Sequence, residues 1–554
     1  MGRSAKKVLK PFNLPLQVLV AVIPFLTGIF YEWQSAVLVV ALVALLIVEA
    51  KKNKRVDVEF GWPLLFSICV VIFHVLTAFW AVDKGMVWLG VLKFLPLPLF
   101  VLAASRKEDV LKHLPLSGVV MTIASLILSP FDKLKGHITV RGRLGGFFEY
   151  PNTFAMFLLV CLILVLFKEK IKLKDWIFAA VFLAGIALSG SRTVLILTAL
   201  TALIFVIWVK DKKIKIISAC CVVACGALGA VYLITKLSSL SNMSTFYGRL
   251  LYYSDALPVI LKHPFGLGYY GYYYSQGAFQ TGVYSVVHIH NDLLQILLDI
   301  GWIPAILAVV MFVKAFIRAK FQAKVLLAMM ALHLLFDFDM QFVSMSVILL
   351  AVVMSASESK IKTIKANNLY LSLGVLTPVC AFAAVYFGLA SFFAYLNKYD
   401  VAAKIYPSYT ESQKYLLFQS QSNEEMEAIA GRLLKNNPNL PIANDAMARL
   451  AFSKGDINGM MGYKETAIRN NKYVLSEYTD YIDMLSYSIT LFTQAGDGQS
   501  AVYCMNRCIQ IESDLRAVDE GTSALGRKID DQPQLTLPEE YSEYIVMLQN
   551  AKSS

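Results

Sequence analysis

The sequence predicts an all-α protein in which a polytopic bundle of transmembrane helices is joined to a helical-repeat domain outside the membrane. Of its 554 residues, 57% are hydrophobic and only 16% are charged, and the mean hydropathy is positive. Ordinary soluble globular proteins are more polar than this. Apolar stretches that approach the roughly 20 residues needed to cross a bilayer recur from Phe12 to about Leu396. Beyond this point the hydropathy falls, which places a domain boundary between residues 1–396 and residues 397–554.

The first apolar segment, Leu14 to Phe30, is expected to remain as a membrane helix. It follows a basic start, Arg3 to Lys10, as the apolar part of a secretory signal does. The small residues of a cleavage site do not precede Tyr31-Glu32-Trp33, and further apolar segments follow. The segment is therefore predicted to be the first span of the bundle.

The polar breaks between the apolar segments alternate in charge, and this alternation predicts the topology. Cytoplasmic loops of membrane proteins carry an excess of Lys and Arg. Every second break is basic, which gives about 13 spans, a cytoplasmic N-terminus and a C-terminal domain on the outer side. The basic breaks are Arg3 to Lys10, Lys51 to Arg55, Arg106 to Lys112, Lys168 to Lys174, Lys210 to Lys215, Lys314 to Lys324 and Lys360 to Lys365. The breaks poorer in positive charge are Tyr31 to Trp33, Ala81 to Gly85, Pro130 to Asn152, Ser189 to Arg192, Leu237 to Asn291 and Asp337 to Met340.

The net charge of +12 comes largely from these membrane-flanking breaks. Basic residues at such positions meet anionic lipid headgroups, so membrane lipid is an expected partner and nucleic acid is not. Cys504 and Cys508 lie four residues apart on a predicted helix of the outer domain, a spacing that suits a disulfide poorly, so free thiols are expected. The other cysteines fall in apolar spans and are expected to behave as small buried hydrophobes: Cys69, Cys161, Cys220, Cys221, Cys225 and Cys380.

Residues 397–554 predict paired helices with short turns. Asn437-Pro438, Gly455-Asp456 and Gly496-Asp497 interrupt segments with apolar residues at helical spacing. The two Gly-Asp turns lie about 41 residues apart, whereas the tetratricopeptide period is about 34, so the likeness to that repeat is loose. The domain is expected to act as a structural cap or to bind a glycan or an envelope biosynthesis protein, and the sequence leaves these roles open. The predicted helical segments include Glu424 to Leu434, Ile442 to Phe452, Met460 to Ile468 and Ser500 to Ile511.

Charged groups at the outer ends of spans are the best pointers to function, because burying them is costly without a partner or a task. Arg141 and Arg143 lie in a glycine-containing loop, where flexible backbone can approach a phosphate and arginine can grip it bidentately. Arg192 ends a tight break, Leu188 to Ser191, that would hold its guanidinium at the membrane surface. The alternatives are a solvated loop for the first pair and a snorkelling interface anchor for Arg192.

The long outer loop, residues 237–291, contains Arg249 and a tyrosine-dense run from Tyr269 to Tyr274. Rings such as those of Tyr269 and Tyr272 can stack on sugar faces, because a flat apolar ring with a polar edge matches a pyranose. Tyrosines of this kind also mark membrane interfaces. The pattern does not choose between these two interpretations.

The loop ends in His288-Ile289-His290-Asn291, directly before an apolar segment that begins at Asp292. Asn291 is a good helix N-cap for that segment. The positive end of a helix dipole favours a neutral imidazole and attracts an anionic group such as a diphosphate. His290 is therefore a candidate general base for a sugar hydroxyl, with a purely structural histidine as the alternative.

A metal site is the competing interpretation, because His288, His290 and Asp292 bring together three possible ligands. The other outer breaks supply no clear ligand set that would complete it. Asp337-Phe338-Asp339 is the nearest candidate, and we interpret it as a polar turn between two hydrophobic helices. No metal and no other cofactor is therefore predicted.

At these residues the sequence resembles the O-antigen ligase and O-antigen polymerase superfamily of bacterial envelope proteins. His290-Asn291, nine residues and Gly301-Trp302-Ile303-Pro304 look like the ligase signature, in which His and Asn, Ser or Gln are followed after nine residues by Gly-x-x-Gly. One position departs, since Pro304 replaces the second glycine of that signature.

The resemblance covers roughly Phe12 to Glu358. The stretch from Arg249 to Gly268 is similar to the start of the domain that defines the superfamily. Arg143 with Pro151-Asn152, and Ser189 to Arg192, match its recurrent elements. Many members carry a tetratricopeptide-like tail, and the resemblance implies one in residues 397–554.

The resemblance implies a metal-independent, inverting glycosyltransferase with a GT-C-like helical fold in the bacterial cytoplasmic membrane. Its substrate would be a glycan linked to undecaprenyl diphosphate, and its acceptor a second glycan or a lipid. Arg143, Arg192 and Arg249 would stabilise the leaving group, and His290 would activate the acceptor hydroxyl. The residues expected to bind substrate are Arg141, Asn291, His288, Tyr269 and Tyr272.

A lipid-linked glycan flippase or transporter is the main rival. Such a protein would carry charges within its spans and internal repeat symmetry. Lys93 and Asp299 are candidate intramembrane charges, whereas no convincing repeat is found. Lys93 can snorkel, and Asp299 lies seven residues after Asp292, so both aspartates are expected to face one cavity.

Two further alternatives concern the reaction itself. A non-catalytic envelope scaffold would tolerate changes at the arginine and histidine positions. Within the enzyme interpretation, ligase and polymerase differ in acceptor, and the sequence favours a polymerase or cell-wall glycan transferase without deciding between them.

Overall fold

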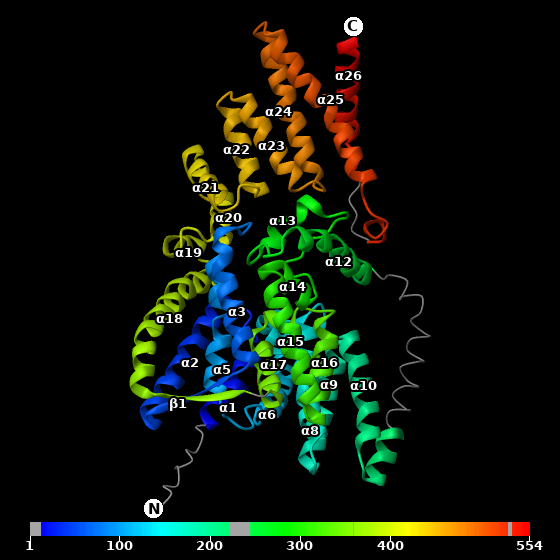
Figure 1. The fold of residues 1–554 in the computed structure, drawn as a ribbon. Helices are drawn as coiled ribbons and strands as arrows, with labels where there is room; N and C mark the ends of the chain where they lie inside the picture. Colours follow the sequence, from blue (N-terminus) through cyan, green and yellow to red (C-terminus); the bar gives the residue numbers. More distant parts are fainter. Residues whose placement is uncertain (1–12, 221–243, 358, 530–534, 554) are drawn as a thin grey trace, which may run out of the picture. The chain divides into compact units, whose positions relative to one another are not determined.

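The computed structural model describes residues 13–220, 244–357, 359–529 and 535–553. Helices make up most of these residues, and the strands among them form two small antiparallel sheets, β1–β4 and β2–β3 (Figure 1). The all-α prediction is therefore confirmed. The basic start Arg3 to Lys10 and the cysteines Cys221 and Cys225 lie outside the described residues.

The chain divides into two compact units. The first takes its described residues from Met1–Leu76, Trp88–Ser241 and His290–Tyr395, and the second from Thr77–Val87, Asn242–Ile289 and Leu396–Ser554. The C-terminal residues thus group with two segments that come from the predicted transmembrane half of the sequence.

The first unit consists mainly of apolar helices. In its N-terminal part these elements are α1 (Asn13–Val22), α2 (Glu32–Asn53), β1 (Arg55–Phe60), α3 (Trp62–Leu76), α4 (Val87–Phe94), α5 (Pro96–Ala104), α6 (Leu114–Leu128), α7 (Asp132–Ile138), β2 (Thr139–Val140), β3 (Arg143–Leu144), α8 (Pro151–Leu166), α9 (Leu173–Ser189) and α10 (Arg192–Trp208). Its C-terminal part contains α14 (Asp292–Ile300), α15 (Trp302–Arg318), α16 (Phe321–Leu334), α17 (Val343–Ala356), β4 (Lys360–Lys365) and α18 (Ala366–Tyr395).

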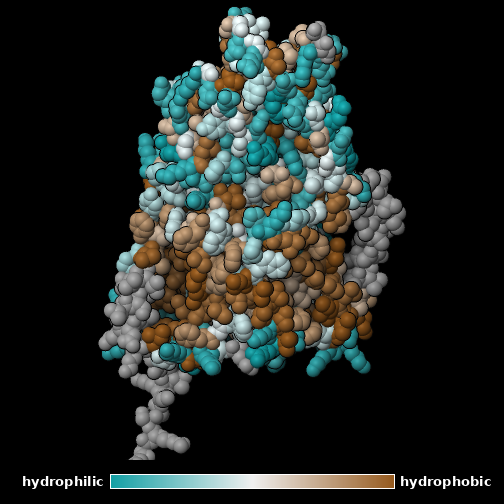
Figure 2. All heavy atoms as spheres, turned by 45° about the horizontal axis from the view of Figure 1, so that its top comes forward, coloured by the Kyte–Doolittle hydropathy of each residue, from teal (hydrophilic) through white to brown (hydrophobic). Residues whose placement is uncertain are grey.

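Within the described residues, four helical stretches are long and apolar enough to cross a membrane: Glu32–Asn53, Trp62–Phe79, Val87–Ala104 and Thr377–Tyr395. Shorter apolar helices include Pro151–Leu166, Arg192–Trp208 and Val343–Ala356. Figure 2 shows apolar side chains gathered in a band over such helices, with hydrophilic residues along its lower edge. The chain is therefore a membrane protein, whereas the figure of about 13 spans stays a prediction.

Polar breaks that the charge pattern assigns to the cytoplasmic side contact one another. β1 pairs with β4 in antiparallel register from Arg55↔Lys365 to Phe60↔Lys360. Arg106, from a third basic break, forms an ion pair with Asp57 of β1 at 3.0 Å. Segments far apart in the sequence are therefore joined, and the side of the membrane on which they lie stays a prediction.

Breaks that the pattern assigns to the outer side also meet within the first unit. The backbone N–H groups of Val343 and Ser344 donate to the carbonyls of Ile29 and Gly28, at 3.2 and 3.0 Å. These contacts place the end of the first apolar segment beside the start of α17. The candidate site described below uses breaks of the same predicted side.

The second unit contains the helices of the C-terminal part and two from the long loop. The turns predicted at Gly455-Asp456 and Gly496-Asp497 are present: both glycines have a left-handed φ of 74°, and both aspartates cap the next helix. Its helices are α12 (Ser244–Lys262), α13 (Gly271–Phe279), α19 (Tyr399–Ile405), α20 (Thr410–Gln419), α21 (Asn423–Asn436), α22 (Pro441–Ser453), α23 (Ile457–Arg469), α24 (Leu475–Gln494), α25 (Gly498–Glu520) and α26 (Glu539–Ser553).

Cys504 and Cys508 lie in the apolar core of this unit, on α25. Both side chains are buried and both are free thiols, so the prediction for this pair is confirmed. Burial raises the pKa of the Cys508 thiol to about 12, which keeps it protonated and unreactive at neutral pH.

Candidate functional site

His290 lies immediately before α14, and its backbone conformation is unusual. Its φ of 57° falls in the left-handed region, which non-glycine residues rarely occupy and which costs about 1–3 kcal/mol. Asn291 caps the helix as predicted, since its Oδ1 accepts a hydrogen bond from the Leu294 N–H at 3.0 Å. Its Nδ2 also donates to the Leu335 carbonyl at 3.1 Å, which ties the start of α14 to the end of α16. These bonds fix the start of α14, directly after the backbone position that carries the His290 imidazole.

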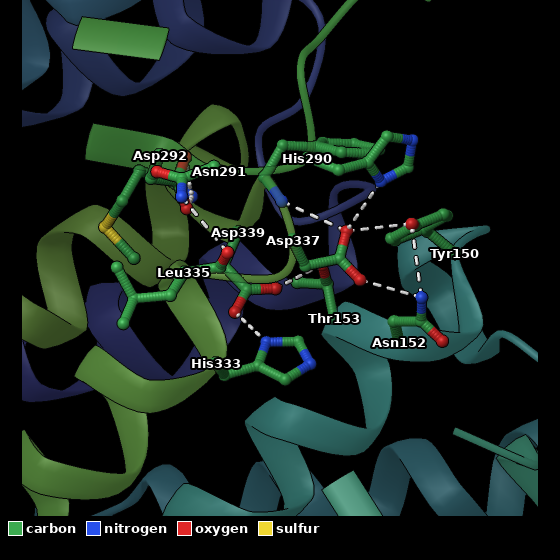
Figure 3. Close-up of polar contacts among 12 residues, drawn as sticks. Tyr150, Asn152, Thr153, His290, Asn291, Asp292, His333, Leu335, Asp337 and Asp339 are labelled. Atoms are coloured by element: carbon green, nitrogen blue, oxygen red, sulfur yellow. Dashed lines mark hydrogen bonds and ion pairs between the residues drawn. The ribbon is translucent and has the colours of Figure 1, made fainter. Parts of the chain in front are cut away.

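The His290 side chain faces the carboxylate of Asp337 (Figure 3). The distance from its Nδ1 to Asp337 Oδ1 is 3.4 Å, and the imidazole is 23% exposed while Asp337 is 2% exposed. The Phe338 ring contacts the imidazole edge to face, with the ring centroids 4.9 Å apart. An accessible imidazole therefore stands against a buried carboxylate, the pairing used to orient a general base.

Asp337 also accepts hydrogen bonds from the start of α8 (Figure 3). The Tyr150 hydroxyl donates to its Oδ1 at 2.9 Å, and Asn152 Nδ2 donates to its Oδ2 at 2.7 Å. Asn152 in turn accepts a hydrogen bond from a terminal nitrogen of Arg143 at 2.7 Å. The predicted cation Arg143 is thus connected to the predicted base His290 through two side chains.

The position of Arg143 follows from a short hairpin, β2–β3, with Arg141 and Gly142 at its turn. Both turn residues have a positive φ, 50° and 76°, as two-residue hairpin loops require. The expected glycine-containing loop is therefore an ordered hairpin, and Arg141 is exposed at its tip. Arg143 is partly buried, and its Nε donates to the Ser189 carbonyl at 2.7 Å.

The break from Ser189 to Arg192 forms the tight turn that the sequence predicts. Gly190 ends α9 with a φ of 59°, and a Cβ at this position would lie 3.4 Å from Arg143 Nε. Arg192 is the first residue of α10 and is exposed. Arg143 therefore contacts the residue before Gly190, and Arg192 follows this glycine by two positions in the sequence.

A second group of polar residues is buried beneath the His290 pair. His333 Nδ1 lies 2.5 Å from Asp339 Oδ2, and the Thr153 hydroxyl donates to Asp339 Oδ1 at 2.6 Å. The carboxylate of Asp292 accepts the Met340 N–H at 3.1 Å. Among the residues that the structure describes, three or more His, Cys, Asp and Glu side chains are nowhere arranged to hold a metal ion.

The other predicted site residues belong to the second unit. Arg249 lies on α12, where burial raises the pKa of Tyr252 and the nearby Arg249 guanidinium opposes that rise. On the same helix, Asp255 accepts hydrogen bonds from the Thr281 N–H and hydroxyl at 2.8 and 2.7 Å. These bonds anchor the end of the tyrosine-containing segment to α12.

Tyr269 and Tyr272 do not offer the open ring faces that sugar stacking requires. Tyr272 is fully buried, packs on Phe279 and shares a hydrogen bond with the Tyr284 hydroxyl at 3.2 Å. Tyr269 is also buried. His288 is buried too and stacks on Tyr270, with the ring centroids 5.8 Å apart. Burial argues for a packing role of both predicted tyrosines.

Lys93 and Asp299 lie inside the first unit. Lys93 is 0% exposed, so it does not snorkel to a surface, and its Nζ lies 4.7 Å from the centre of the Phe30 ring. Asp292 and Asp299 both line one cavity of about 220 Å³ whose other walls are mostly apolar, as the seven-residue spacing predicts. Both Lys93 and Asp299 are therefore buried within the first unit.

Asp337 is the residue that sequence reasoning missed. It was interpreted with Asp339 as a polar turn, yet both carboxylates are buried and bonded to α8. The available signal was the presence of two acidic residues at the end of an apolar segment, where burial needs a partner. The partner, Asn152, lies 185 positions away in sequence, so its identity could not be read locally.

Residues 177–310 match the family model described as O-antigen ligase. The O-antigen ligase match runs from α9 into α15 and contains Arg192, Arg249 and His290, whereas Arg143 and Asp337 lie outside it. A comparison with curated proteins gave no match to the chain. The O-antigen ligase match supports the predicted family and its association with surface polysaccharide biosynthesis.

Proposed function

We propose that the protein transfers or polymerises a glycan carried on undecaprenyl diphosphate at the outer face of the bacterial cytoplasmic membrane. The acceptor is a second glycan or a lipid, and the product is a surface polysaccharide. The observation that carries the proposal is the connection from His290 through Asp337 and Asn152 to Arg143. It brings a candidate base and a candidate cation to one network, as glycosyl transfer from a diphosphate requires.

In the proposed reaction His290 takes the proton of the acceptor hydroxyl. The acceptor oxygen forms a bond to the anomeric carbon on the face opposite the diphosphate, so the configuration inverts. The bond between that carbon and the phosphate oxygen breaks, and undecaprenyl diphosphate leaves with the electron pair. Asp337, 3.4 Å from the imidazole, orients the base and stabilises the imidazolium that forms.

The leaving diphosphate needs positive charge, and we assign this role to Arg143 and Arg192 at the Gly190 turn. Arginine presents five N–H donors in a planar fork that matches phosphate oxygens. The bonds of Arg143 to Ser189 and Asn152 hold its guanidinium in place before substrate arrives. Preorganised donors of this kind stabilise developing charge without further rearrangement. The proposed reaction uses no metal ion.

The roles of the remaining predicted residues follow from the sequence resemblance. Arg249 is proposed to add positive charge, and Arg141, Asn291 and His288 to contact substrate. Tyr269 and Tyr272 are buried and are instead proposed to stabilise the conformation of the segment that precedes His290. The C-terminal helices are proposed to bind a glycan or an envelope biosynthesis protein.

A transporter of lipid-linked glycans is the second candidate, and one observation favours it. Lys93, Asp292 and Asp299 are buried within the first unit, and intramembrane ionisable groups commonly mark transport pathways. An enzyme needs the His290 network, whereas a transporter needs the Lys93 and Asp299 charges. Replacing each set separately therefore distinguishes the two functions.

The test is to delete the gene and restore it as wild type, Arg143→Gln or Arg516→Gln. Arg516 is an exposed arginine of α25, so its variant controls for the loss of one positive charge. We expect Arg143→Gln to lower polysaccharide formation by about 10²–10³-fold, as for other lost charge-stabilising donors, and Arg516→Gln to restore it fully. Equal restoration by both variants, with equal protein levels, would refute the proposed role of Arg143.

The same deletion strain identifies the reaction. Loss of chain length with single repeat units retained indicates a polymerase, and loss of the attached polymer with free lipid-linked polymer indicates a ligase. Purified protein is expected to keep its transfer activity in EDTA. Loss of activity in EDTA that added divalent metal restores would contradict the metal-independent mechanism.

A further inference from the structure

The ribbon formed by β1 and β4 joins two predicted basic breaks, and this pairing is not apparent from the sequence. Its strands lie about 300 residues apart in the chain and contact the ends of α2 and α18 (Figure 1). Opposed residues of an antiparallel pair share a face, so Lys360 lies with Phe60, and Lys362 with Val58. Val58 is buried, whereas both lysines are exposed. The lysines therefore form the rim of this face.

The acidic residues of the ribbon are engaged on its other face. Asp57 forms an ion pair with Arg106 at 3.0 Å and accepts a hydrogen bond from the Thr363 hydroxyl at 2.6 Å. Glu59 accepts a hydrogen bond from the Arg106 N–H at 2.7 Å. These carboxylates thus balance Arg106 rather than the lysines of β4. The face that carries Lys360 and Lys362 keeps a positive charge.

An open pocket of about 720 Å³ lies beside this face. Leu65 and Ile68 are exposed on α3, about one helical turn apart, and continue its apolar wall away from the ribbon. The Lys314 ammonium lies 4.1 Å from the centre of the Trp62 ring, so a second basic break reaches the same place. The pocket is lined by Phe60, Gly61, Trp62, Leu64, Leu65, Ile68, Ser359 and Lys360.

We propose that this pocket binds an anionic phospholipid of the membrane. The phosphate would contact Lys360 and Lys362, and the acyl chains would lie along Leu65 and Ile68. The positive rim and the apolar wall match the two parts of such a lipid, and tryptophan is favoured at the level of the headgroups. Both strands come from breaks predicted to face the cytoplasm, where anionic lipids concentrate. The site is separate from the His290 network and does not depend on glycosyl transfer.

The test uses the purified full-length protein and tryptophan quenching by brominated phosphatidylglycerol, with brominated phosphatidylcholine as the neutral probe. A Trp62→Phe variant identifies the part of the signal that comes from the pocket. The charge variant is Lys360→Gln with Lys362→Gln. Its matched control is Lys210→Gln with Lys212→Gln, which removes two exposed lysines from another predicted cytoplasmic break.

We expect the Lys360/Lys362 variant to bind phosphatidylglycerol about tenfold more weakly, because each lysine near a lipid surface contributes appreciably to binding. Quenching by phosphatidylcholine is expected to stay unchanged. The control is expected to bind like wild type. Equal weakening in both variants, or an unchanged signal in Trp62→Phe, would overturn the proposal. The single variant Lys360→Gln, with a smaller expected loss, provides the test if the double variant does not fold.

Discussion

Two His–Asp pairs lie close together in the first unit, and they differ in access rather than in composition. His333 and Asp339 are 2.5 Å apart, and both side chains are almost completely buried. His290 and Asp337 are 3.4 Å apart, and the His290 imidazole is 23% exposed. A group that takes a proton from substrate must be reachable. By this criterion the accessible His290–Asp337 pair is the candidate for chemistry, and the buried His333–Asp339 pair is the candidate for a structural role.

Replacing His290 tests the difference between the two pairs most directly. We expect His290→Ala to lower transfer by about 10²–10⁴-fold, the usual contribution of a general base, while the amount of folded protein stays close to that of wild type. Transfer from lipid-linked glycan by purified protein is the measurement. His113→Ala, in a predicted cytoplasmic break, is the matched control and should keep wild-type activity. Full activity of His290→Ala would remove His290 from the mechanism.

The buried pair should respond in the opposite way. We expect His333→Ala to lower the free energy of unfolding by about 3–5 kcal/mol, because the buried Asp339 carboxylate loses its ion-pair partner and keeps only the Thr153 hydroxyl among the side chains described above. Denaturant unfolding in detergent measures this change, and activity should be expressed per folded molecule. A stable His333→Ala protein that is folded but inactive would reverse the assignment of the two pairs.

Asp337→Asn should give the smallest effect of the three substitutions. It tests whether Asp337 acts through His290 in the accessible pair. Asparagine keeps the size of the side chain but loses the negative charge that orients and stabilises the base. We expect kcat to fall by roughly 10–10²-fold with KM nearly unchanged, since Asp337 acts through His290. Asp211→Asn, an exposed aspartate whose hydrogen bonds asparagine can also make, is the control. An effect on KM alone would argue for substrate binding instead.

Local signals in the sequence were sufficient for much of the helical structure. Asn291 caps α14 because its side chain and the following apolar segment are adjacent in sequence. Gly455 and Gly496 form left-handed turns for the same reason, since each is followed by a capping aspartate. Such features depend on a few neighbouring residues, so they can be predicted without knowledge of the fold.

Long-range pairing could not be predicted in this way. Asp337 reads as a turn residue until Tyr150 and Asn152 are placed against it. The β1–β4 ribbon likewise joins two basic breaks whose strand character becomes apparent only when they pair. The composition of the tyrosine run likewise does not reveal that Tyr272 is buried and hydrogen-bonded to the Tyr284 hydroxyl.

The left-handed backbone at His290 sets the proposed chemistry against stability at a single position. Glycine would adopt this conformation without the steric penalty that a Cβ imposes, so the fold alone would favour glycine there. The protein instead keeps an imidazole in a strained setting, as expected where selection acts on reactivity rather than on robustness. The strained backbone thus lowers the stability of the folded protein at the residue on which its proposed catalysis depends.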